Sequence, residues 1–340
     1  MFDSQFKISN LTLSNNTKAL IIAEIGINHE GDFNKCLKLI SSAVLAGADL
    51  VKMQILDPKE NYCERSSSYK LYKKSILSDE KIFNIYNFCR KNKIKLFSTF
   101  DRSKFEFYKK LNPICYKVSS SLLLDVFLIK DLLKTNKPIL VSTGMSDLKD
   151  IDFYVKFLSK SANKKICLMH CMSLYPTPIR KTNLMLIEYL KKRYKLLTGF
   201  SDHSNLIDTS VAAIHYGAKI IEKHFTFDSK RAGYDHGISL NFNDFLLMVK
   251  KIRLNEKMIG NVNNKFSSSD KIKIIKLSRR LQATNDIYPE KFIKKNDLKT
   301  IRINSTKNYS KYSDIIFKIM NKKVRRKILK NSILLSKDFY

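Results

Sequence analysis

The sequence predicts an α/β protein built as a (β/α)8 barrel and followed by a small second domain. Eight short apolar runs, rich in Val, Ile and Leu, recur along the first three quarters of the 340 residues, with amphipathic stretches between them. Near-continuous apolar runs are typical of parallel strands that are covered on both faces. Eight strand–helix units over a span close to the ~250 residues of a typical barrel favour a closed barrel over an open, doubly wound sheet.

These runs place the strands and helices along the chain. The predicted strands are Ala19–Ile25, Asp49–Gln54, Ile94–Phe100, Cys115–Ser120, Pro138–Thr143, Ile166–Cys171, Leu196–Asp202 and Ala218–Phe225. Helical spacing of apolar residues is clearest in Asn34–Ala46, Glu80–Lys91 and Thr209–Tyr216. The connection from Ile55 to Ser78 is long for a strand-to-helix loop, so we expect it to cover part of the barrel mouth.

A change in composition marks the predicted domain boundaries. Residues 1–260 form the predicted barrel domain. Residues 261–276 begin with the polar stretch NVNNKFSSSD and are predicted to be a linker. Residues 277–340 are strongly basic with short apolar stretches, which indicates a small second domain with a thin core of its own.

Composition also excludes several classes of protein. Hydrophobic residues make up 44% of the chain, which argues against disorder, and no apolar run is long enough to span a membrane. The N-terminus lacks a secretory pattern and the six cysteines are scattered, so we expect a cytoplasmic protein with reduced thiols. The net charge of +32 is spread over the whole chain, which favours a compositional bias over a nucleic-acid surface.

Polar side chains close all eight predicted strands. In a barrel of this class the active site lies at the carboxyl ends of the strands. One polar strand end is ordinary, whereas eight together predict a single polar pocket. These residues are Glu24, Asn28, His29, Lys52, Gln54, Ser98, Thr99, Lys117, Ser119, Ser120, Ser121, Ser142, Thr143, His170, Ser201, Asp202, His203, Glu222 and His224.

The residue types in this pocket favour a small, multiply charged anion such as a phosphate ester. Lys52 and Lys117 supply point charges, and the Ser and Thr hydroxyls supply directional donors. The sequence contains neither a P-loop nor a GxGxxG segment, which disfavours nucleotide and dinucleotide chemistry. The pocket therefore predicts a phosphorylated small-molecule substrate.

Two histidines in the predicted pocket suit a divalent metal ion. His203 and His224 end neighbouring strands, which lie about 4.8 Å apart, so both imidazoles can reach one cation. Mn²⁺ is the favoured ion, and Mg²⁺ or Co²⁺ could take its place. Consecutive strand residues face opposite sides, so Ser201, Asp202 and His203 are not expected to form a catalytic triad.

Seven segments, taken in order, resemble the sialic acid synthase family. They are AEIGINHEG (23–31), VKMQ (51–54), FSTF (97–100), STGM (142–145), YPTP (175–178), GFSDH (199–203) and IEKHF (221–225). The C-terminal part is similar to that family's antifreeze-like (SAF) domain through SRRL (278–281) and DLKTIR (297–302). The resemblance implies a TIM barrel followed by a SAF domain.

The resemblance also implies an activity. Members of the family condense phosphoenolpyruvate with an open-chain N-acetylated sugar such as N-acetylmannosamine, giving a nine-carbon 2-keto acid (a nonulosonic acid) and phosphate. In that scheme a metal on His203 and His224 polarises the sugar aldehyde and the methylene carbon of phosphoenolpyruvate attacks it. Water then adds at C2, and the tetrahedral intermediate loses phosphate by cleavage of the C–O bond.

Roles for individual residues follow from the same resemblance. Glu24 corresponds to the acidic group beside the reacting centre and would act in catalysis with His203 and His224. Arg302 stands where the family places an arginine that reaches the neighbouring subunit's sugar site, which implies a domain-swapped homodimer. The positions that resemble the phosphoenolpyruvate-binding set are Lys52, Thr99, Lys117, Ser120, Ser142, Ser173 and Ser201, and those that resemble the acceptor-sugar set are Gln54, Tyr175, Asp235 and Arg302.

The chain departs from the family pattern at several of these positions, which leaves its exact activity open. Ser121-Leu122 stands where many members have Gly-Glu, and Ser173 where sialic acid synthases often have Asn. A legionaminic, pseudaminic or spore-coat polysaccharide-type synthase would keep the chemistry and change the acceptor sugar. Two further hypotheses are a non-catalytic relative and a nucleic-acid-binding protein that uses the basic run at 322–327.

Overall fold

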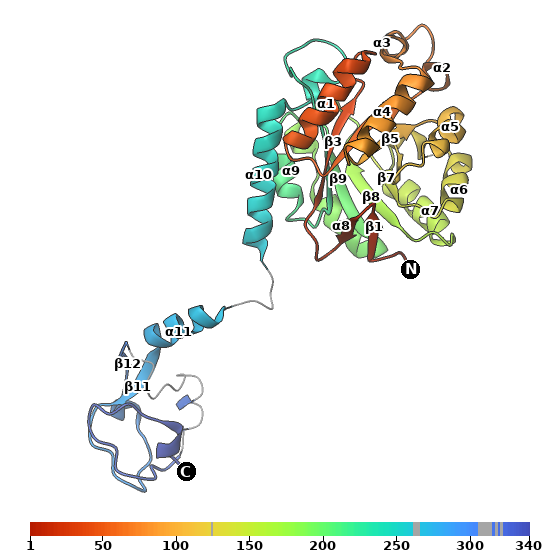
Figure 1. Cartoon of the computed structure of the whole chain (residues 1–340). Coiled ribbons are helices and arrows are strands. Elements are labelled where there is room, and N and C mark those ends of the chain that lie inside the picture. Colours follow the sequence, from red (N-terminus) through yellow and green to blue (C-terminus); the bar gives the residue numbers. More distant parts are fainter. Residues whose placement is uncertain (124, 261–265, 305–314, 317–318, 320–321) are drawn as a thin grey trace. The chain divides into compact units, whose positions relative to one another are not determined.

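The computed structural model describes residues 1–123, 125–260, 266–304, 315–316, 319 and 322–340 (Figure 1). The chain divides into two compact units, Met1–Ile259 and Gly260–Tyr340. Within the described ranges, no helix combines the length and the apolar character that crossing a membrane requires.

The first unit is a closed barrel of eight parallel strands, as predicted. The strands follow one another around the barrel in chain order, and the last pairs with the first. All seven residues of β3 and all six of β8 are buried, because the barrel interior covers one face of each strand and helices cover the other. The strands are β3 (Leu20–Gly26), β4 (Leu50–Ile55), β5 (Leu96–Phe100), β6 (Tyr116–Val118), β7 (Ile139–Ser142), β8 (Ile166–Cys171), β9 (Leu197–Asp202) and β10 (Ile220–His224).

Helices surround the barrel on its outer side (Figure 1). They are α1 (Phe33–Leu45), α4 (Asp79–Lys91), α5 (Phe105–Lys110), α6 (Val126–Lys134), α7 (Leu148–Ser159), α8 (Met185–Tyr194), α9 (Asp208–Ala213) and α10 (Phe242–Ile259). In α1 the buried residues Cys36, Leu39, Ile40 and Ala43 repeat at helical spacing and so form one apolar stripe. The predicted helix Thr209–Tyr216 is shorter in the structure because turns follow α9, up to Gly217 with a φ of 92°.

Two apolar layers hold the barrel together. One lies between the strands and the helices, and the other fills the barrel interior with residues such as Leu20, Phe97 and Leu197. A hairpin of β1 (Gln5–Ile8) and β2 (Leu11–Ser14) belongs to the interior layer. This hairpin is not predictable from the sequence, since strands of four residues give too short an alternation of apolar and polar positions to recognise.

Short elements occupy the loops between the strands and the main helices. The long connection after β4 contains α2 (Pro58–Asn61) and α3 (Ser67–Ser75). Asp57 and Ser66 cap these two helices by accepting hydrogen bonds from the backbone amides of Lys59 and Tyr69. The 3₁₀ turns are η1 (Arg102–Lys104), η2 (Ser120–Leu122), η3 (Ile179–Lys181), η4 (His236–Ile238), η5 (Lys295–Asp297) and η6 (Ser336–Asp338).

The second unit contains a two-stranded antiparallel sheet and a small core. Strand β11 (Arg279–Ala283) pairs with β12 (Leu298–Arg302). Its apolar cluster includes Leu281, Val324 and Phe339. The predicted linker, 261–276, lies partly outside the described residues, and α11 (Ser268–Leu277) forms in its second half behind a capping box of Ser267 and Asp270.

A substitution at Gly199 in β9 would test how closely the barrel interior is packed. A Cβ atom there would lie 2.9 Å from both Cβ and the carbonyl oxygen of Ile220 and would press on Sδ of Met169. Gly199→Ala should therefore lower the free energy of unfolding by about 1–3 kcal/mol, measured by urea denaturation. Gly237→Ala is the control, because no atom of the described residues lies within 4 Å of the added Cβ. Equal stability of the two variants would contradict this close packing of β9 against β10.

Candidate functional site

A cavity of about 570 Å³ is formed by residues at the carboxyl ends of the strands and in the loops that follow them. It brings together residues that are far apart in the sequence, and Lys52, Lys117, His203 and His224 all line it. The other predicted site residues on its wall are Glu24, Gln54, Thr99, Ser120, Ser142, Tyr175, Ser201 and Asp235. The long connection after β4 contributes Glu60, Asn61, Tyr62, Ser68 and Tyr72, so it covers part of the mouth as expected.

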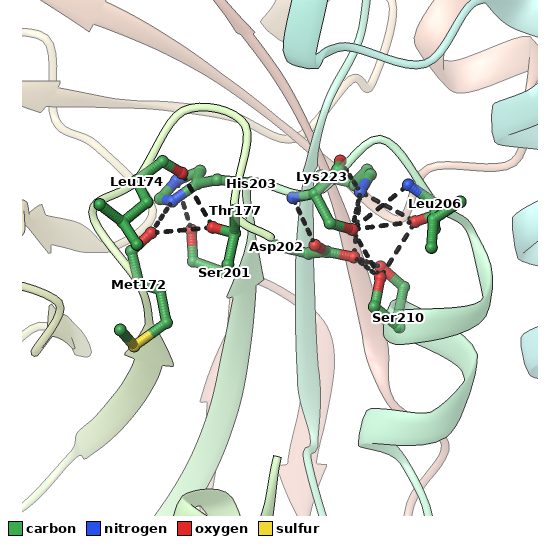
Figure 2. Close-up of polar contacts among 11 residues, drawn as sticks. Met172, Leu174, Thr177, Ser201, Asp202, His203, Leu206, Ser210 and Lys223 are labelled. Carbon is green, nitrogen blue, oxygen red and sulfur yellow. Dashed lines mark hydrogen bonds and ion pairs between the residues drawn. The ribbon is translucent and has the colours of Figure 1, made fainter. Parts of the chain in front are cut away.

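The ends of β9 and β10 send alternate side chains to opposite sides. Figure 2 shows Ser201 and His203 on one side and Asp202 with Lys223 on the other. Asp202 and Lys223 are fully buried and form an ion pair of 3.0 Å across the two strands. Asp202 also accepts hydrogen bonds from Oγ of Ser210 at 2.7 Å and from the Ser204 amide at 2.8 Å. Ser201, Asp202 and His203 therefore do not form a triad.

His203 is held as a neutral ring with one nitrogen available for a ligand. Its Nδ1 lies 2.9 Å from the carbonyl oxygen of Met172 (Figure 2). Because a carbonyl can only accept, Nδ1 carries the proton and Nε2 carries the lone pair, 3.4 Å from Oγ of Ser201. Burial lowers the pKa of His203. A ring fixed in this way by a backbone carbonyl is the usual arrangement of a metal-binding histidine.

His224 ends β10, which pairs with β9, and it lies beside His203 on the cavity wall. The centres of the two rings are 5.6 Å apart. Burial, with the neighbouring His203, lowers the pKa of His224 well below its ordinary value, and its buried Nδ1 makes no hydrogen bond with any residue that the structure describes. Two neutral imidazoles, one with an unsatisfied nitrogen, fit a divalent cation. In the described part of the chain, no group of three His, Cys, Asp or Glu side chains is placed to hold a metal ion.

Glu222 holds the two lysines of the cavity together. Its Oε1 lies 3.3 Å from Nζ of Lys52 and 3.3 Å from Nζ of Lys117, and it accepts a hydrogen bond of 2.8 Å from Oγ of Ser201. Burial acts to raise the pKa of Glu222, but the two lysines hold it well below its ordinary value. The sequence placed Glu222 in the predicted pocket, as found, but assigned it no individual role; its place two residues before His224 puts both on the same side of β10.

Glu24 differs from Glu222 because only one lysine lies beside it. Burial raises its pKa to about 7, although Lys52, at 3.3 Å, acts in the opposite direction. Oε1 of Glu24 accepts from Nε2 of Gln54 at 3.0 Å, and Oε1 of Gln54 accepts from the hydroxyl of Tyr72 at 2.9 Å. Tyr72, which the sequence analysis did not select, thus orients the Gln54 amide. The pKa values of Glu24 and Glu222 are therefore shifted in opposite directions, so Glu24 holds a proton more readily than Glu222 does.

Several buried polar atoms in this region make no hydrogen bond. Buried donors and acceptors are nearly always paired, so unpaired ones at a cavity indicate where a polar ligand binds. Not every hydroxyl at the cavity is of this kind, since Oγ of Ser120 accepts a hydrogen bond of 2.9 Å from the Gly144 amide. The atoms that make no hydrogen bond with the described residues are Oγ of Ser142, Oγ of Ser173, Oε2 of Glu222, Nδ1 of His224 and Oε2 of Glu24, of which the last has an ion pair with Lys52.

Some expected residues lie elsewhere. His170 points away from the cavity, with Nε2 2.8 Å from the carbonyl oxygen of Thr182, and β8 contributes Cys171 to the cavity wall instead. Ser173 does not line the cavity but lies beside it, since a Cβ on Gly144 would be 2.6 Å from its Oγ. Arg302 is exposed at the end of β12 in the second unit. The outward turn of His170 follows from strand alternation, because Cys171 takes the inward position.

Several known proteins are similar to this chain over most of its length. The model of the NeuB family matches residues 39–264. N,N'-diacetyllegionaminic acid synthase of Campylobacter jejuni is 32% identical over 322 residues, with 90% of this chain and 96% of that protein covered. Pseudaminic acid synthase of the same species is 30% identical, with 91% and 94% covered. The crystal structure of N-acetylneuraminic acid synthetase from Leptospira borgpetersenii, in complex with citrate, superimposes with a TM-score of 0.75 at 27% identity, covering 80% of this chain and 96% of that one.

The raised pKa of Glu24 predicts a pH dependence of stability. The carboxyl group titrates near pH 7 when folded and near its ordinary 4.5 when unfolded. The folded state therefore holds the proton more tightly, and this contribution to stability is lost as the pH rises through about 7. We expect the free energy of unfolding of the wild type, relative to that of Glu24→Gln, to fall between about pH 5 and pH 8. Urea denaturation across this range measures it, and a rising or constant difference would contradict the assignment.

Proposed function

Because the chain belongs to the NeuB family, we propose that it condenses phosphoenolpyruvate with an open-chain N-acetylated sugar to form a nonulosonic acid and phosphate. The observation that carries this proposal is the pairing, in one cavity, of two buried lysines with two neutral histidines. The lysines suit a substrate that bears both a phosphate and a carboxylate. The histidines suit a cation beside the second substrate's carbonyl group.

The phosphoenolpyruvate end of the cavity is formed by Lys52, Lys117 and the serines around them. Both ammonium groups are already gathered by Glu222 before any substrate binds. The hydroxyl of Ser142 lines the cavity and makes no hydrogen bond with the described residues, so it can donate to a phosphate oxygen, and that of Ser173 lies beside the cavity. Donors that are already in place stabilise developing negative charge without reorganisation, which is the main source of rate acceleration in such sites. The predicted set Lys52, Thr99, Lys117, Ser120, Ser142, Ser173 and Ser201 is therefore retained as the proposal for this end.

Glu24 is the residue we assign to proton transfer at the reacting centre. A carboxyl group whose pKa is about 7 can hold or release a proton near neutral pH, as a general acid or base must. Gln54 and Lys52 bind its two oxygens and so fix its orientation. Glu222 cannot take this role, because the lysines keep it ionised.

His203 and His224 would hold the divalent cation, for which Mn²⁺ is the preferred candidate. When bound there, the cation would supply Lewis-acid polarisation of the sugar aldehyde. The Met172 carbonyl keeps Nε2 of His203 free of its proton. Tyr175, whose ring centre is 4.5 Å from that of His203, limits the movement of the imidazole and forms part of the proposed acceptor wall with Gln54 and Asp235.

The acceptor is proposed to carry no phosphate of its own. The charged residues that line the cavity in the described chain are two lysines and four carboxyl groups, Glu24, Glu60, Glu222 and Asp235. Phosphoenolpyruvate would engage both lysines, which leaves carboxyl groups facing the acceptor. N-acetylmannosamine satisfies this condition. Leu122 and Met145 on the same wall favour an acceptor with an apolar substituent.

We also propose that the second unit is the antifreeze-like domain and that the protein is a domain-swapped dimer. Arg302 is exposed and ends a strand paired in register with β11, so its guanidinium is free to contact a neighbouring subunit. In such a dimer it would contribute to the partner's acceptor site. Mixing an Arg302→Ala subunit with a His203→Ala subunit would then restore one intact site.

The main test is phosphate release from phosphoenolpyruvate in the presence of Mn²⁺ and a panel of N-acetylated sugars. Release should require the metal and one of the sugars, and the mass of the product identifies the acceptor. His203→Ala should lower the rate by at least about a hundredfold, because a ligand of the cation is lost. His215→Ala is the matched control, since this histidine is exposed beyond α9. Phosphate release without any sugar, or full activity of His203→Ala, would overturn the proposal.

The charge of the cavity gives a second prediction. An unphosphorylated acceptor should be used roughly a hundredfold more efficiently, in kcat/KM, than the same sugar with a terminal phosphate, because juxtaposed like charges cost several kcal/mol. Steady-state kinetics with N-acetylmannosamine and its 6-phosphate measure the ratio. A preference for the phosphorylated sugar would contradict the charge argument and leave the condensation itself intact.

A further inference from the structure

Two loops at the cavity mouth are joined by contacts that the proposed chemistry does not use. The turn after β3 covers residues 27–31 and is called the β3 turn. The segment after β10 that carries Asp235 covers residues 226–239 and is called the Asp235 loop. We propose that Asn28 and Glu30 in the β3 turn are positioning residues that hold the carboxylate of Asp235 at the cavity. This inference rests on the proposed function in taking Asp235 as a residue that binds the acceptor.

Asn28 joins three points at or near the Asp235 loop through one buried amide. Its Nδ2 donates to the carbonyl oxygen of Phe225 and to Oγ of Ser239, both at 3.0 Å. Its Oδ1 accepts from the backbone amide of Asp235 at 3.0 Å. Oγ of Ser239 in turn donates to the carbonyl oxygen of Asp235 at 2.5 Å. Both polar backbone groups of Asp235 are thus fixed, directly or through Ser239, by a side chain with no solvent exposure.

Glu30 makes a second, independent attachment. Its Oε2 lies 2.6 Å from Nη2 of Arg231, and its Oε1 lies 3.0 Å from Nε2 of His236. His236 is 1% exposed and its Nδ1 lies 2.7 Å from Oγ1 of Thr226. Glu30 therefore binds the loop on both sides of Asp235, one residue after it and four residues before it. A carboxylate with charged or ring N–H partners forms stronger hydrogen bonds than a neutral acceptor does.

The Asp235 carboxylate has close neighbours, so it has little room to move. Gly26 has a φ of 50°, and a Cβ atom there would lie 2.8 Å from Oδ2 of Asp235. The carboxylate thus lies close against the backbone at the end of β3, with the same Oδ2 3.7 Å from Nδ1 of His224. Residues 230–233 of the loop are exposed, so they supply no buried packing to hold it. Asn28 and Glu30 supply the attachment that this stretch lacks.

Kinetics of single and double variants test the assignment. Asn28→Ala and Glu30→Gln should each raise the KM for the acceptor sugar by about tenfold, as expected for the loss of a charge-assisted or buried hydrogen bond, with the KM for phosphoenolpyruvate changed by less than about twofold. In an Asp235→Ala background neither change should raise the acceptor KM further, because residues that act through Asp235 lose their effect when it is absent. Additive effects, or equal increases in both KM values, would overturn the inference.

Lys35→Met is the matched control. Nζ of Lys35 lies 2.6 Å from the same Oε1 of Glu30, but Lys35 belongs to α1 and this ion pair does not join Glu30 to the Asp235 loop. Its removal should leave the acceptor KM unchanged. If Asn28→Ala does not fold, the test relies on Glu30→Gln. Glu30 is partly exposed, and glutamine has nearly the same size and shape as glutamate, so this variant should fold.

Amide hydrogen exchange separates this inference from the proposed function. In Glu30→Gln the amides of the Asp235 loop should exchange at least about tenfold faster than in the wild type, and in Lys35→Met they should not. The measurement needs no substrate, so it is decisive even if no sugar supports phosphate release. Unchanged exchange of the loop in Glu30→Gln would overturn the attachment, whereas absent turnover with faster exchange would count against the proposed chemistry alone.

Discussion

The shared carboxylate of Glu222 is the contact on which the arrangement of the site depends. It brings Lys52 and Lys117 to the same oxygen atom in a region where all three side chains are buried. Two ammonium groups buried side by side would repel each other, and a buried charge is costly unless it is paired and hydrogen-bonded. Burial lowers the pKa of Lys117, and Glu222 offsets part of this effect. The cavity can therefore present two cations to an anionic substrate without losing their protons.

Strand alternation explains how the same two strands form both the site and its support. Inward positions of β9 and β10 carry Ser201, Glu222 and His224, while the outward positions carry Asp202 and Lys223. The outward pair lies in register across the strands, so it fixes the relative height of the inward residues. A one-residue shift of either strand would exchange the two sets, which makes the buried ion pair and the cavity mutually dependent.

The loops differ from the strands in how they are held. Strand residues take their places from the barrel, whereas Asp235 and Tyr72 reach the cavity on connections whose positions depend on a few side-chain contacts. Asn28 and Glu30 hold one of these connections, and the Tyr72–Gln54 hydrogen bond links the other to Glu24. This division agrees with the general placement of specificity on loops over a rigid scaffold.

Local pattern alone determined much of this protein. Apolar runs located all eight strands. The polar ends of those runs identified His203, His224, Lys52 and Lys117 as residues of one cavity, because the strands of a parallel barrel bring their carboxyl ends together. Only the tertiary structure decided which strand-end groups face inward and why the pKa of Glu24 is raised while that of Glu222 is lowered. It also decided that a hairpin of two four-residue strands packs with the barrel interior. These features depend on burial and on contacts between residues distant in the chain. Periodicity along the sequence carries no information about either of them.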